Sequence, residues 1–249
     1  MIEELRRWIR QRLSPRRHTA LLIAIVAAFG VRPLIGNGAT AAALFSVALL
    51  VLLLVALYAI QVDELMGERA TLLAQRQRRS VVGWVLAAFA VFERLAAMVS
   101  PTHQLLVVGT LSWLLFIIYV TWSELRSVLK QKDVTGESIA MSISVYLLMG
   151  LAWGLLYILL FQLQPNAFNL SGSPTPAPGR AEDVQPLFPI FVYFSLTTLS
   201  TIGYGDIIPV SLQARYAAVA EGITGQFYLA ILVARLVGLQ MSRSADRRN

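Results

Sequence analysis

The sequence predicts an all-α protein embedded in a membrane. Of its 249 residues, 57% are hydrophobic and only 14% are charged, and one soluble core cannot bury so large an apolar share. Crossing the hydrocarbon layer takes about 20 largely apolar residues per helix, and six stretches approach that length. They are residues 19–35, 39–62, 80–99, 104–122, 138–164 and 212–241. We therefore expect six transmembrane helices joined by short connections.

Basic residues lie in alternate connections between these stretches. The basic segments are the residues before 19, residues 63–80, residues 123–137 and the residues after 241. The other connections, 36–38, 100–103 and 165–186, carry only Arg180. Short loops rich in Lys and Arg stay in the cytoplasm. We therefore expect a multi-pass protein of the cell membrane, the inner membrane in a bacterium, with both termini cytoplasmic.

The net charge of +7 reflects this loop bias. A nucleic-acid-binding protein would gather its basic residues on one face of a soluble domain, whereas these are spread over four segments. We therefore expect no nucleic-acid partner. Cysteine is absent, which excludes disulfides and thiolate metal sites.

Residues 1–18 predict a cytoplasmic amphipathic helix. Apolar side chains at helical spacing share one side and arginines occupy the other; the apolar ones are Ile2, Leu5, Trp8, Ile9 and Leu13. Such a helix lies on the inner membrane surface and takes membrane lipids as partners, anionic lipid in particular. A frayed tail is the alternative. The region also imitates a secretory signal, but its removal would leave an odd number of spans.

Five residues near the end of the chain, Thr201-Ile202-Gly203-Tyr204-Gly205, form its most informative motif. Gly203 and Gly205 lack a Cβ, so they can take the left-handed dihedrals that aim successive carbonyls inward. If four chains each contribute one copy around an axis, the stacked carbonyl oxygens replace the water shell of a dehydrated cation. Thr201 adds a hydroxyl ligand, while Ile202 and Tyr204 point outward against surrounding helix. An ordinary Gly-Tyr-Gly-Asp turn is the alternative.

The segments beside the motif favour the pore interpretation. Residues 187–200 are apolar and rich in hydroxyl groups, and they are too short to span a bilayer. They suit a re-entrant helix, which is tolerated at membrane depth only where protein and water surround it. Residues 165–186 contain Ser-Gly-Ser-Pro-Thr-Pro-Ala-Pro-Gly, a composition that predicts a mobile loop without helix or strand.

Residues 138–249 resemble the two-helix pore module of tetrameric potassium channels. The matching parts are an outer helix at 138–164, a turret at 165–186, a pore helix at 187–200, a selectivity filter at 201–205 and an inner helix at 212–241. Pro209 and Arg215 also stand where such channels often carry Pro and Arg. The resemblance implies a homotetramer that conducts K+ passively. The K+ ions would bind at Thr201, Ile202, Gly203 and Tyr204, with no other cofactor.

The resemblance extends into the inner helix. Gly225 lies nineteen residues beyond Asp206, where the family uses a glycine as a gating hinge. Close packing between helices is the alternative role for this small residue. The same register implies that six residues line the cavity and the inner gate, namely Gln226, Leu229, Ala230, Val233, Ala234 and Val237.

The support behind the motif departs from the family pattern. Some of these channels pair the filter's aspartate, here Asp206, with a glutamate whose position is taken by Thr197. Tyr193 and Phe194 stand where two tryptophans often brace the filter, and only Tyr193 keeps a polar tip. Glu221 falls one turn before Gly225, where we expect it to contact pore-helix hydroxyls, with Ser195, Thr198 and Ser200 as candidates. The alternative is a direct role in conduction, in which its charge raises the local cation concentration.

Residues 19–137 predict a four-helix transmembrane domain that matches a voltage sensor only in its number of helices. A sensor needs several basic residues in its fourth helix, and none lies between Gln104 and Trp122. We therefore expect no voltage gating. Two charge pairs are further expectations, one between Glu93 and Arg32 and one from Arg235 to Glu124 or Glu137. Snorkelling of these side chains to the membrane interface is the alternative.

Other function classes remain to be separated from a potassium channel. One rival is a weakly selective cation channel. Another is a non-conducting membrane scaffold or sensor whose four-helix domain binds lipid or a partner. An enzyme is not expected, because no pair or triad of His, Asp, Glu or Ser suggests catalysis.

Overall fold

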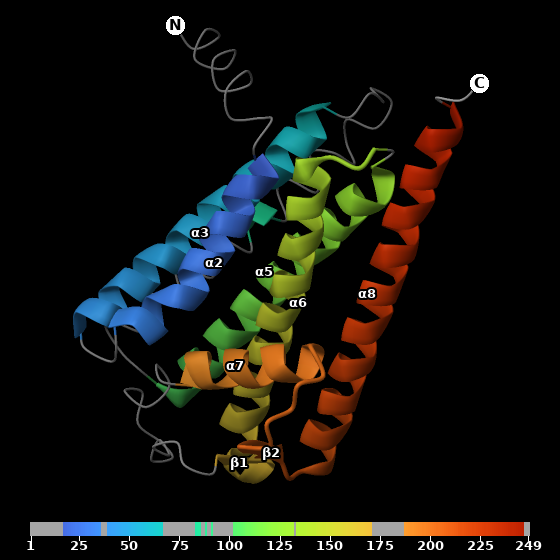
Figure 1. Ribbon diagram of the computed structural model, residues 1–249. Helices are drawn as coiled ribbons and strands as arrows, with labels where there is room; N and C mark the ends of the chain where they lie inside the picture. The colour runs from blue at the N-terminus through green and yellow to red at the C-terminus, as the bar shows by residue number, and fades with distance from the viewer. Residues whose placement is uncertain are drawn as a thin grey trace, which may run out of the picture. The chain divides into compact units, whose positions relative to one another are not determined.

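The computed structural model describes residues 17–35, 39–66, 83–85, 88, 91, 102–131, 133–170 and 187–246. Its elements follow in the order drawn in Figure 1: helices α2 (Arg17–Ile35), α3 (Ala39–Met66), α5 (His103–Lys130) and α6 (Gly136–Leu163), the 3-10 turn η3 (Pro165–Ala167), strand β1 (Phe168–Leu170), helix α7 (Leu187–Leu199), strand β2 (Ile207–Pro209) and helix α8 (Leu212–Asp246). The protein is therefore mostly helical, as predicted.

Three helices in the described part of the chain are long and apolar enough to cross a membrane. They are His103–Lys130, Gly136–Leu163 and Leu212–Met241. Shorter apolar helical stretches occupy His18–Gly30, Val47–Ala59 and Leu187–Leu199. The predicted span at 80–99 and the expected pair between Glu93 and Arg32 lie largely outside the described residues. The same holds for the predicted helix at 1–18, of which only Arg17 and His18 are described, as the first residues of α2.

The sequence predicts a connection between helices at 123–137, and this prediction is wrong for most of the segment. Helix α5 continues to Lys130, and α6 begins at Gly136. The charged residues that end the apolar pattern are good helix formers, so they extend the helix beyond the membrane-like stretch. The next start is fixed by a reciprocal cap in which the Thr135 N–H donates to Ser138 Oγ (2.8 Å) and the Ser138 N–H donates to Thr135 Oγ1 (3.2 Å).

The turret prediction also needs correction, because residues 165–170 are not an irregular loop. Turn η3 leads into β1, which pairs antiparallel with β2, so that Phe168 lies opposite Pro209 and Leu170 opposite Ile207. Phe168 and Leu170 are buried while Asn169 between them is exposed. That alternation holds the short strand in place. Residues 171–186 lie outside the described part.

The described chain divides into two compact units that cut across α5, α6 and α8. One unit comprises residues 1–84, 120–145 and 238–249, and the other comprises 85–119 and 146–237. In the first, α2 packs against α3, and each buries an apolar stripe. The stripes are Leu21, Ala24, Ile25 and Ala28 on α2, and Leu52, Leu53, Ala56 and Leu57 on α3.

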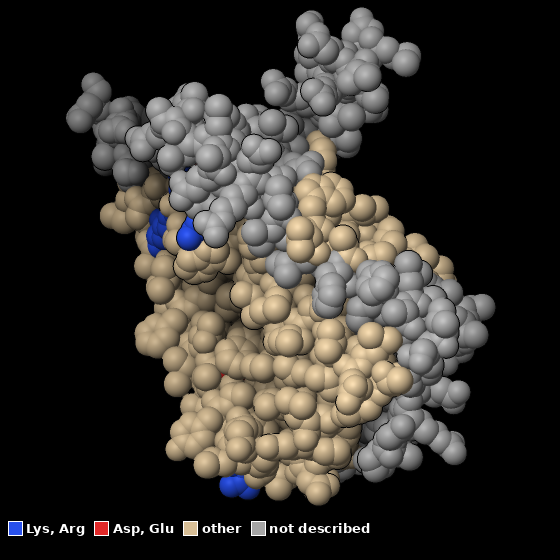
Figure 2. Space-filling view, turned by 180° about the vertical axis from the view of Figure 1, so that it is seen from behind, with Lys and Arg blue, Asp and Glu red and all other residues tan. Residues whose placement is uncertain are grey.

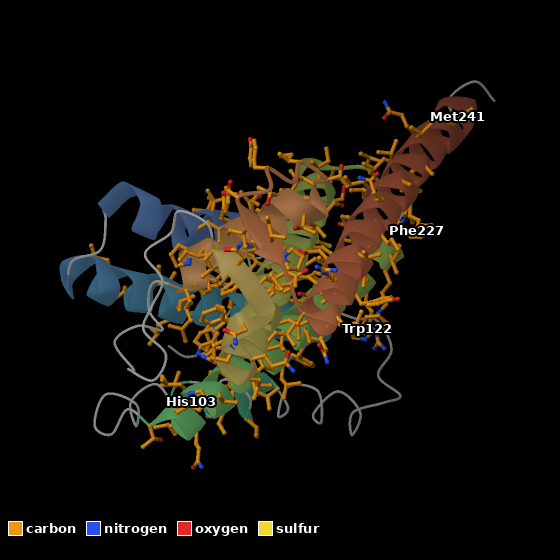
Figure 3. All side chains as sticks on the ribbon, turned by 90° about the horizontal axis from the view of Figure 1, so that it is seen from below. His103, Trp122, Phe227 and Met241 are labelled. Atoms are coloured by element: carbon orange, nitrogen blue, oxygen red, sulfur yellow. The ribbon has the colours of Figure 1, made fainter. Side chains whose placement is uncertain are left out.

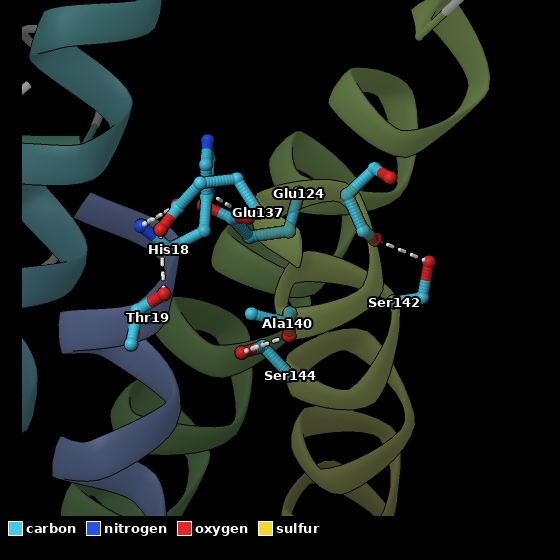
Figure 4. Close-up of polar contacts among 8 residues, drawn as sticks. His18, Thr19, Glu124, Glu137, Ala140, Ser142 and Ser144 are labelled. Atoms are coloured by element: carbon cyan, nitrogen blue, oxygen red, sulfur yellow. Dashed lines mark hydrogen bonds and ion pairs between the residues drawn. The ribbon is translucent and has the colours of Figure 1, made fainter. Parts of the chain in front are cut away.

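A polar junction ties α2 to α5 and α6 in this first unit (Figure 4). His18 Nδ1 lies 2.9 Å from Glu124 Oε2, and both side chains are almost fully buried. Glu137 accepts hydrogen bonds from the His18 N–H (3.2 Å) and from the Thr19 hydroxyl (2.5 Å). A carboxylate at a helix N-terminus is favoured by the helix dipole. The link expected from Arg235 to these two carboxylates stays a prediction.

The second unit is built around an aromatic cluster. Tyr157 of α6 meets Phe194 of α7 (ring centroids 5.0 Å apart) and Phe168 of β1 (5.6 Å), and Phe168 also meets Phe191 (4.9 Å). Helix α7 approaches α6 closely at Gly154, where an added Cβ would lie 3.2 Å from Val192 Cα. This packing fixes the end of α7, from which the motif residues continue.

Candidate functional site

The chain leaves α7 by folding back over the helix end. The N–H groups of Ile202 and Gly203 both donate to the Thr197 carbonyl, at 2.8 and 3.2 Å, and the Thr201 N–H donates to the Thr198 carbonyl at 3.0 Å. These bonds satisfy carbonyls that a helix C-terminus otherwise leaves without partners. The segment Thr201–Gly205 is thereby anchored at its start.

The backbone of this segment alternates in handedness. Thr201 has φ 59°, Gly203 has φ 53° and Gly205 has φ 79°, and these are the positive φ values among the described residues. The two glycines take the left-handed dihedrals that the sequence predicts for them. Alternating left- and right-handed residues turns successive peptide groups the same way, whereas an extended strand would alternate them.

Thr201 is the unexpected member of this alternation. Positive φ is unfavourable for a β-branched residue, and strain of this kind gathers at functional sites. Its side chain is exposed, and Gln226 Nε2 of α8 lies 3.4 Å from Thr201 Oγ1. The sequence gives no signal for this conformation, because threonine is ordinarily found at negative φ.

The side chains around the segment partly follow the expectation. Ile202 and Tyr204 are 56% and 69% exposed in the single chain, and Tyr204 stacks parallel to Tyr193 with ring centroids 6.4 Å apart. A Cβ added at Gly203 or Gly205 would meet no atom within 4 Å. The space beside both glycines is therefore open.

Tyr193, and not Thr197, is the hydrogen-bond partner of Asp206. The Tyr193 hydroxyl donates to Asp206 Oδ2 at 2.8 Å, and Asp206 Oδ1 accepts from the Ile207 N–H at 3.1 Å. This bond raises the pKa of the Tyr193 phenol above its usual value, so the phenol remains a donor. The Thr197 hydroxyl instead donates within α7, to the Phe194 carbonyl at 2.9 Å.

Glu221 is fully buried and bridges three helices. As expected, its carboxyl group contacts the Ser195 hydroxyl of α7. It also accepts a hydrogen bond from the Tyr157 hydroxyl of α6 at 2.6 Å. The sequence gives no signal for Tyr157, which stands among apolar residues in α6 with no pattern to single it out.

Gly225 allows close contact between α8 and the end of α7. A Cβ at this position would lie 2.3 Å from the Leu199 carbonyl oxygen. The close-packing role offered for Gly225 is therefore present, and its role as a hinge stays a prediction. The six residues expected to line a cavity are all exposed on α8, together with neighbours such as Phe227 (Figure 3). The six are Gln226, Leu229, Ala230, Val233, Ala234 and Val237.

The described residues contain no group of three His, Cys, Asp or Glu side chains that could hold a metal ion. The oxygens that the exposed segment 201–205 offers are its main-chain carbonyls and the Thr201 hydroxyl. Such neutral oxygens suit a weakly held alkali cation better than a tightly coordinated transition metal.

Comparisons with known proteins also bear on the function of this part of the chain. A family model described as "Ion channel" matches residues 145–240. Protein LctB of Bacillus caldotenax is 32% identical over 102 residues, which cover 41% of this chain and 71% of that protein. The voltage-gated potassium channel Kch of Escherichia coli strain K12 is 42% identical over 67 residues, 27% of this chain and 14% of its own length. No solved structure matches the chain. The chain therefore belongs to the ion channel family and is a channel, not an enzyme.

Proposed function

We propose that this chain is one subunit of a homotetrameric, potassium-selective channel that conducts passively. The observation that supports the proposal is the alternation in the sign of φ along the exposed segment Thr201–Gly205 at the end of α7, which would allow its carbonyls to face one axis. In a tetramer, four such segments around an axis form a selectivity filter.

The ion would be held by main-chain oxygens. The carbonyls of Thr201, Ile202, Gly203 and Tyr204 replace the hydration shell of K+, and the Thr201 hydroxyl provides the innermost ligand. The C-terminal end of α7, the proposed re-entrant pore helix, adds its partial negative charge toward the cavity below. Asp206 and Tyr193 hold the outer end of the filter.

The proposed subunit spans the membrane six times with both termini in the cytoplasm. Its pore domain comprises residues 138–249, and the four-helix domain comprises residues 19–137. The basic residues before 19 are placed against anionic lipid on the inner surface. The tan face seen in Figure 2 carries few charged side chains, which supports a membrane location.

Voltage does not gate this channel in our proposal. Helix α5 carries no Lys or Arg until Arg126, four residues beyond Trp122. The Arg126 guanidinium lies 4.8 Å from the centre of the Trp122 ring. Arg and Trp both favour the membrane interface. We therefore place the Arg126 charge outside the part of the membrane electric field that a voltage sensor must cross.

The test is ion flux through the purified protein in liposomes. We expect K+ flux, a reversal potential in mixed K+ and Na+ that follows the K+ gradient, and no dependence on voltage. A reversal potential that ignores the K+ gradient would identify a weakly selective cation channel. An absence of flux would identify the non-conducting scaffold.

A matched pair of glycine variants tests the filter itself. An added Cβ at Gly203 or at Gly136 meets no atom within 4 Å, but only Gly203 has positive φ. Gly203→Ala should therefore abolish K+ flux because alanine resists the left-handed dihedral. Gly136→Ala should leave the flux unchanged. Equal flux in the two variants would remove residue 203 from the filter.

A further inference from the structure

Three polar side chains meet in the interior of the second unit, at the level where α7 is held between α6 and α8. Glu221 comes from α8, Tyr157 from α6 and Ser195 from α7, and each is 0% exposed. The Tyr157 hydroxyl lies 2.6 Å from Glu221 Oε2, and the Ser195 hydroxyl contacts Glu221 Oε1. Ser195 Oγ also lies 2.7 Å from the Gly150 carbonyl oxygen of α6.

The hydrogen count of this group determines the protonation of Glu221. There are three oxygen–oxygen contacts, and each needs one hydrogen. The tyrosine and serine hydroxyls supply one hydrogen each. The Gly150 carbonyl can only accept, so Ser195 donates to it, and the contact between Ser195 and Glu221 then needs the third hydrogen. The carboxyl group of Glu221 is the remaining source.

We propose that Glu221 carries a proton in this arrangement and, as the neutral acid, positions the pore helix α7 against α6 and α8. The second part rests on the proposed channel function. A chain of donors then runs from Tyr157 to Glu221, from Glu221 to Ser195, and from Ser195 to the Gly150 carbonyl. Loss of the proton removes the donor to Ser195 and leaves a buried negative charge.

The surroundings favour the neutral acid. No ion pair to Glu221 is present within the described residues. From α6, the titratable groups near it are Tyr157 and Tyr146, neither of which offers a positive charge. From α7 it meets Ser195, and on its own helix Gly225 follows one turn later against the Leu199 carbonyl at the negative end of the α7 dipole. A carboxylate is therefore disfavoured there.

Infrared spectroscopy of the purified full-length protein tests the proton directly. The wild-type spectrum at neutral pH should contain the C=O stretching band of a protonated carboxylic acid that Glu221→Gln lacks. Tyr157→Phe and Ser195→Ala should each shift that band, since each removes one hydrogen bond. Asp133→Asn, which alters an exposed carboxylate, should leave it in place. If the difference between wild type and Glu221→Gln shows only carboxylate bands, the proposal is overturned.

K+ flux tests the positioning role, independently of the infrared measurement. A single proton leaves the protonated fraction falling about tenfold for each pH unit above the midpoint, so wild-type flux should decline with that slope as pH rises. Glutamine keeps an acceptor oxygen and can place an N–H donor where the neutral acid places its O–H, with one further N–H. Glu221→Gln should therefore conduct equally across the same pH range. Parallel declines in the two proteins would overturn the positioning role, whatever the infrared result.

Discussion

At Gly225 the structure separates two roles that the sequence leaves open. The missing Cβ lets α8 lie against the last carbonyl of α7, where any side chain would overlap the Leu199 oxygen. That oxygen belongs to the backbone and cannot rotate away as a side-chain tip would. Close packing is therefore sufficient to require glycine here, whether or not the helix also bends at this point.

A pair of alanine substitutions on one helix should separate packing from mere helix propensity. Gly222 is a matched control for Gly225, because a Cβ there would lie 3.8 Å from the Thr198 carbonyl oxygen, an ordinary contact. Gly225→Ala should destabilise the protein by about 1–3 kcal/mol through overpacking, and Gly222→Ala should not. Thermal unfolding in detergent measures both, and equal melting temperatures would argue against the tight contact.

The Tyr193 hydroxyl should matter for the persistence of the current. Tyr193→Phe keeps the ring that stacks on Tyr204 but removes the donor to Asp206. We expect currents that decay faster than those of the wild type under sustained K+ flux. Tyr216→Phe, at an exposed tyrosine of α8, is the control and should decay as the wild type does. Unchanged decay in Tyr193→Phe would mean that the bond does not support the filter.

The pH range of this effect follows from the same bond. A phenol whose pKa is raised in the folded protein contributes its stabilisation fully below its ordinary value near 10, and loses it as pH rises through the raised value. The difference between Tyr193→Phe and wild type should therefore be constant from neutral pH to about 10. A difference that vanished at pH 8 would contradict the assignment of Tyr193 as the donor.

Among the elements, α2 is joined to α5 and α6 by polar side chains at its first turn. The pair of His18 and Glu124 is buried, and removing either side chain takes a hydrogen bond from a buried polar group. His18→Ala and Glu124→Ala should each destabilise the protein. The double variant should fall short of the sum by about 0.5–3 kcal/mol.

A double-mutant cycle by thermal unfolding in detergent measures this coupling. Ser112→Ala is the reference for Glu124→Ala, because the Ser112 hydroxyl donates within α5 to the Val108 carbonyl and shares no contact with Glu124. That second cycle should be additive. Additivity in the His18 cycle as well would show that the two side chains contribute independently.

The sequence predicts the existence of the long helices better than their ends. Apolar runs locate α2, α3, α6 and α8, because each run must be covered by lipid or by protein. The apolar pattern predicts an end at Trp122 for α5 because Glu124 and Arg126 interrupt that pattern, although neither interrupts a helix. The sequence does not predict strand β1, because its three residues pair with a segment almost forty positions further along the chain. No local pattern marks that segment as a partner.

In the candidate site, too, some features follow from the residue types and others depend on how the helices pack. The left-handed glycines follow from the residue type alone, and so does a polar contact for a carboxyl group buried one turn before Gly225. Which hydroxyls provide that contact depends on how α6, α7 and α8 pack. For that reason Ser195 was one of three candidates, and Tyr157 was not among them.

For the whole molecule, the exposed surface of α8 bears on the proposed assembly of several chains. Several large apolar side chains of this helix are more than half exposed in the single chain, including Tyr216 at 70%, Phe227 at 64% and Val219 at 59%. Lipid can cover one side of such a helix, but the side that continues the exposed Thr201–Gly205 segment faces the proposed water-filled axis. Neighbouring subunits around that axis would bury the remainder.

Subunit mixing tests the number of chains that share one pathway. A filter that contains even one Gly203→Ala subunit is expected not to conduct K+. A channel therefore conducts only if all of its subunits are wild type. When wild-type and variant chains are mixed in equal amounts before reconstitution, a shared tetrameric filter should retain about one sixteenth of the wild-type K+ flux. A mixture of wild type and Gly136→Ala should retain all of it. Retention of half the flux would mean that each chain conducts alone, and one quarter would mean a dimer.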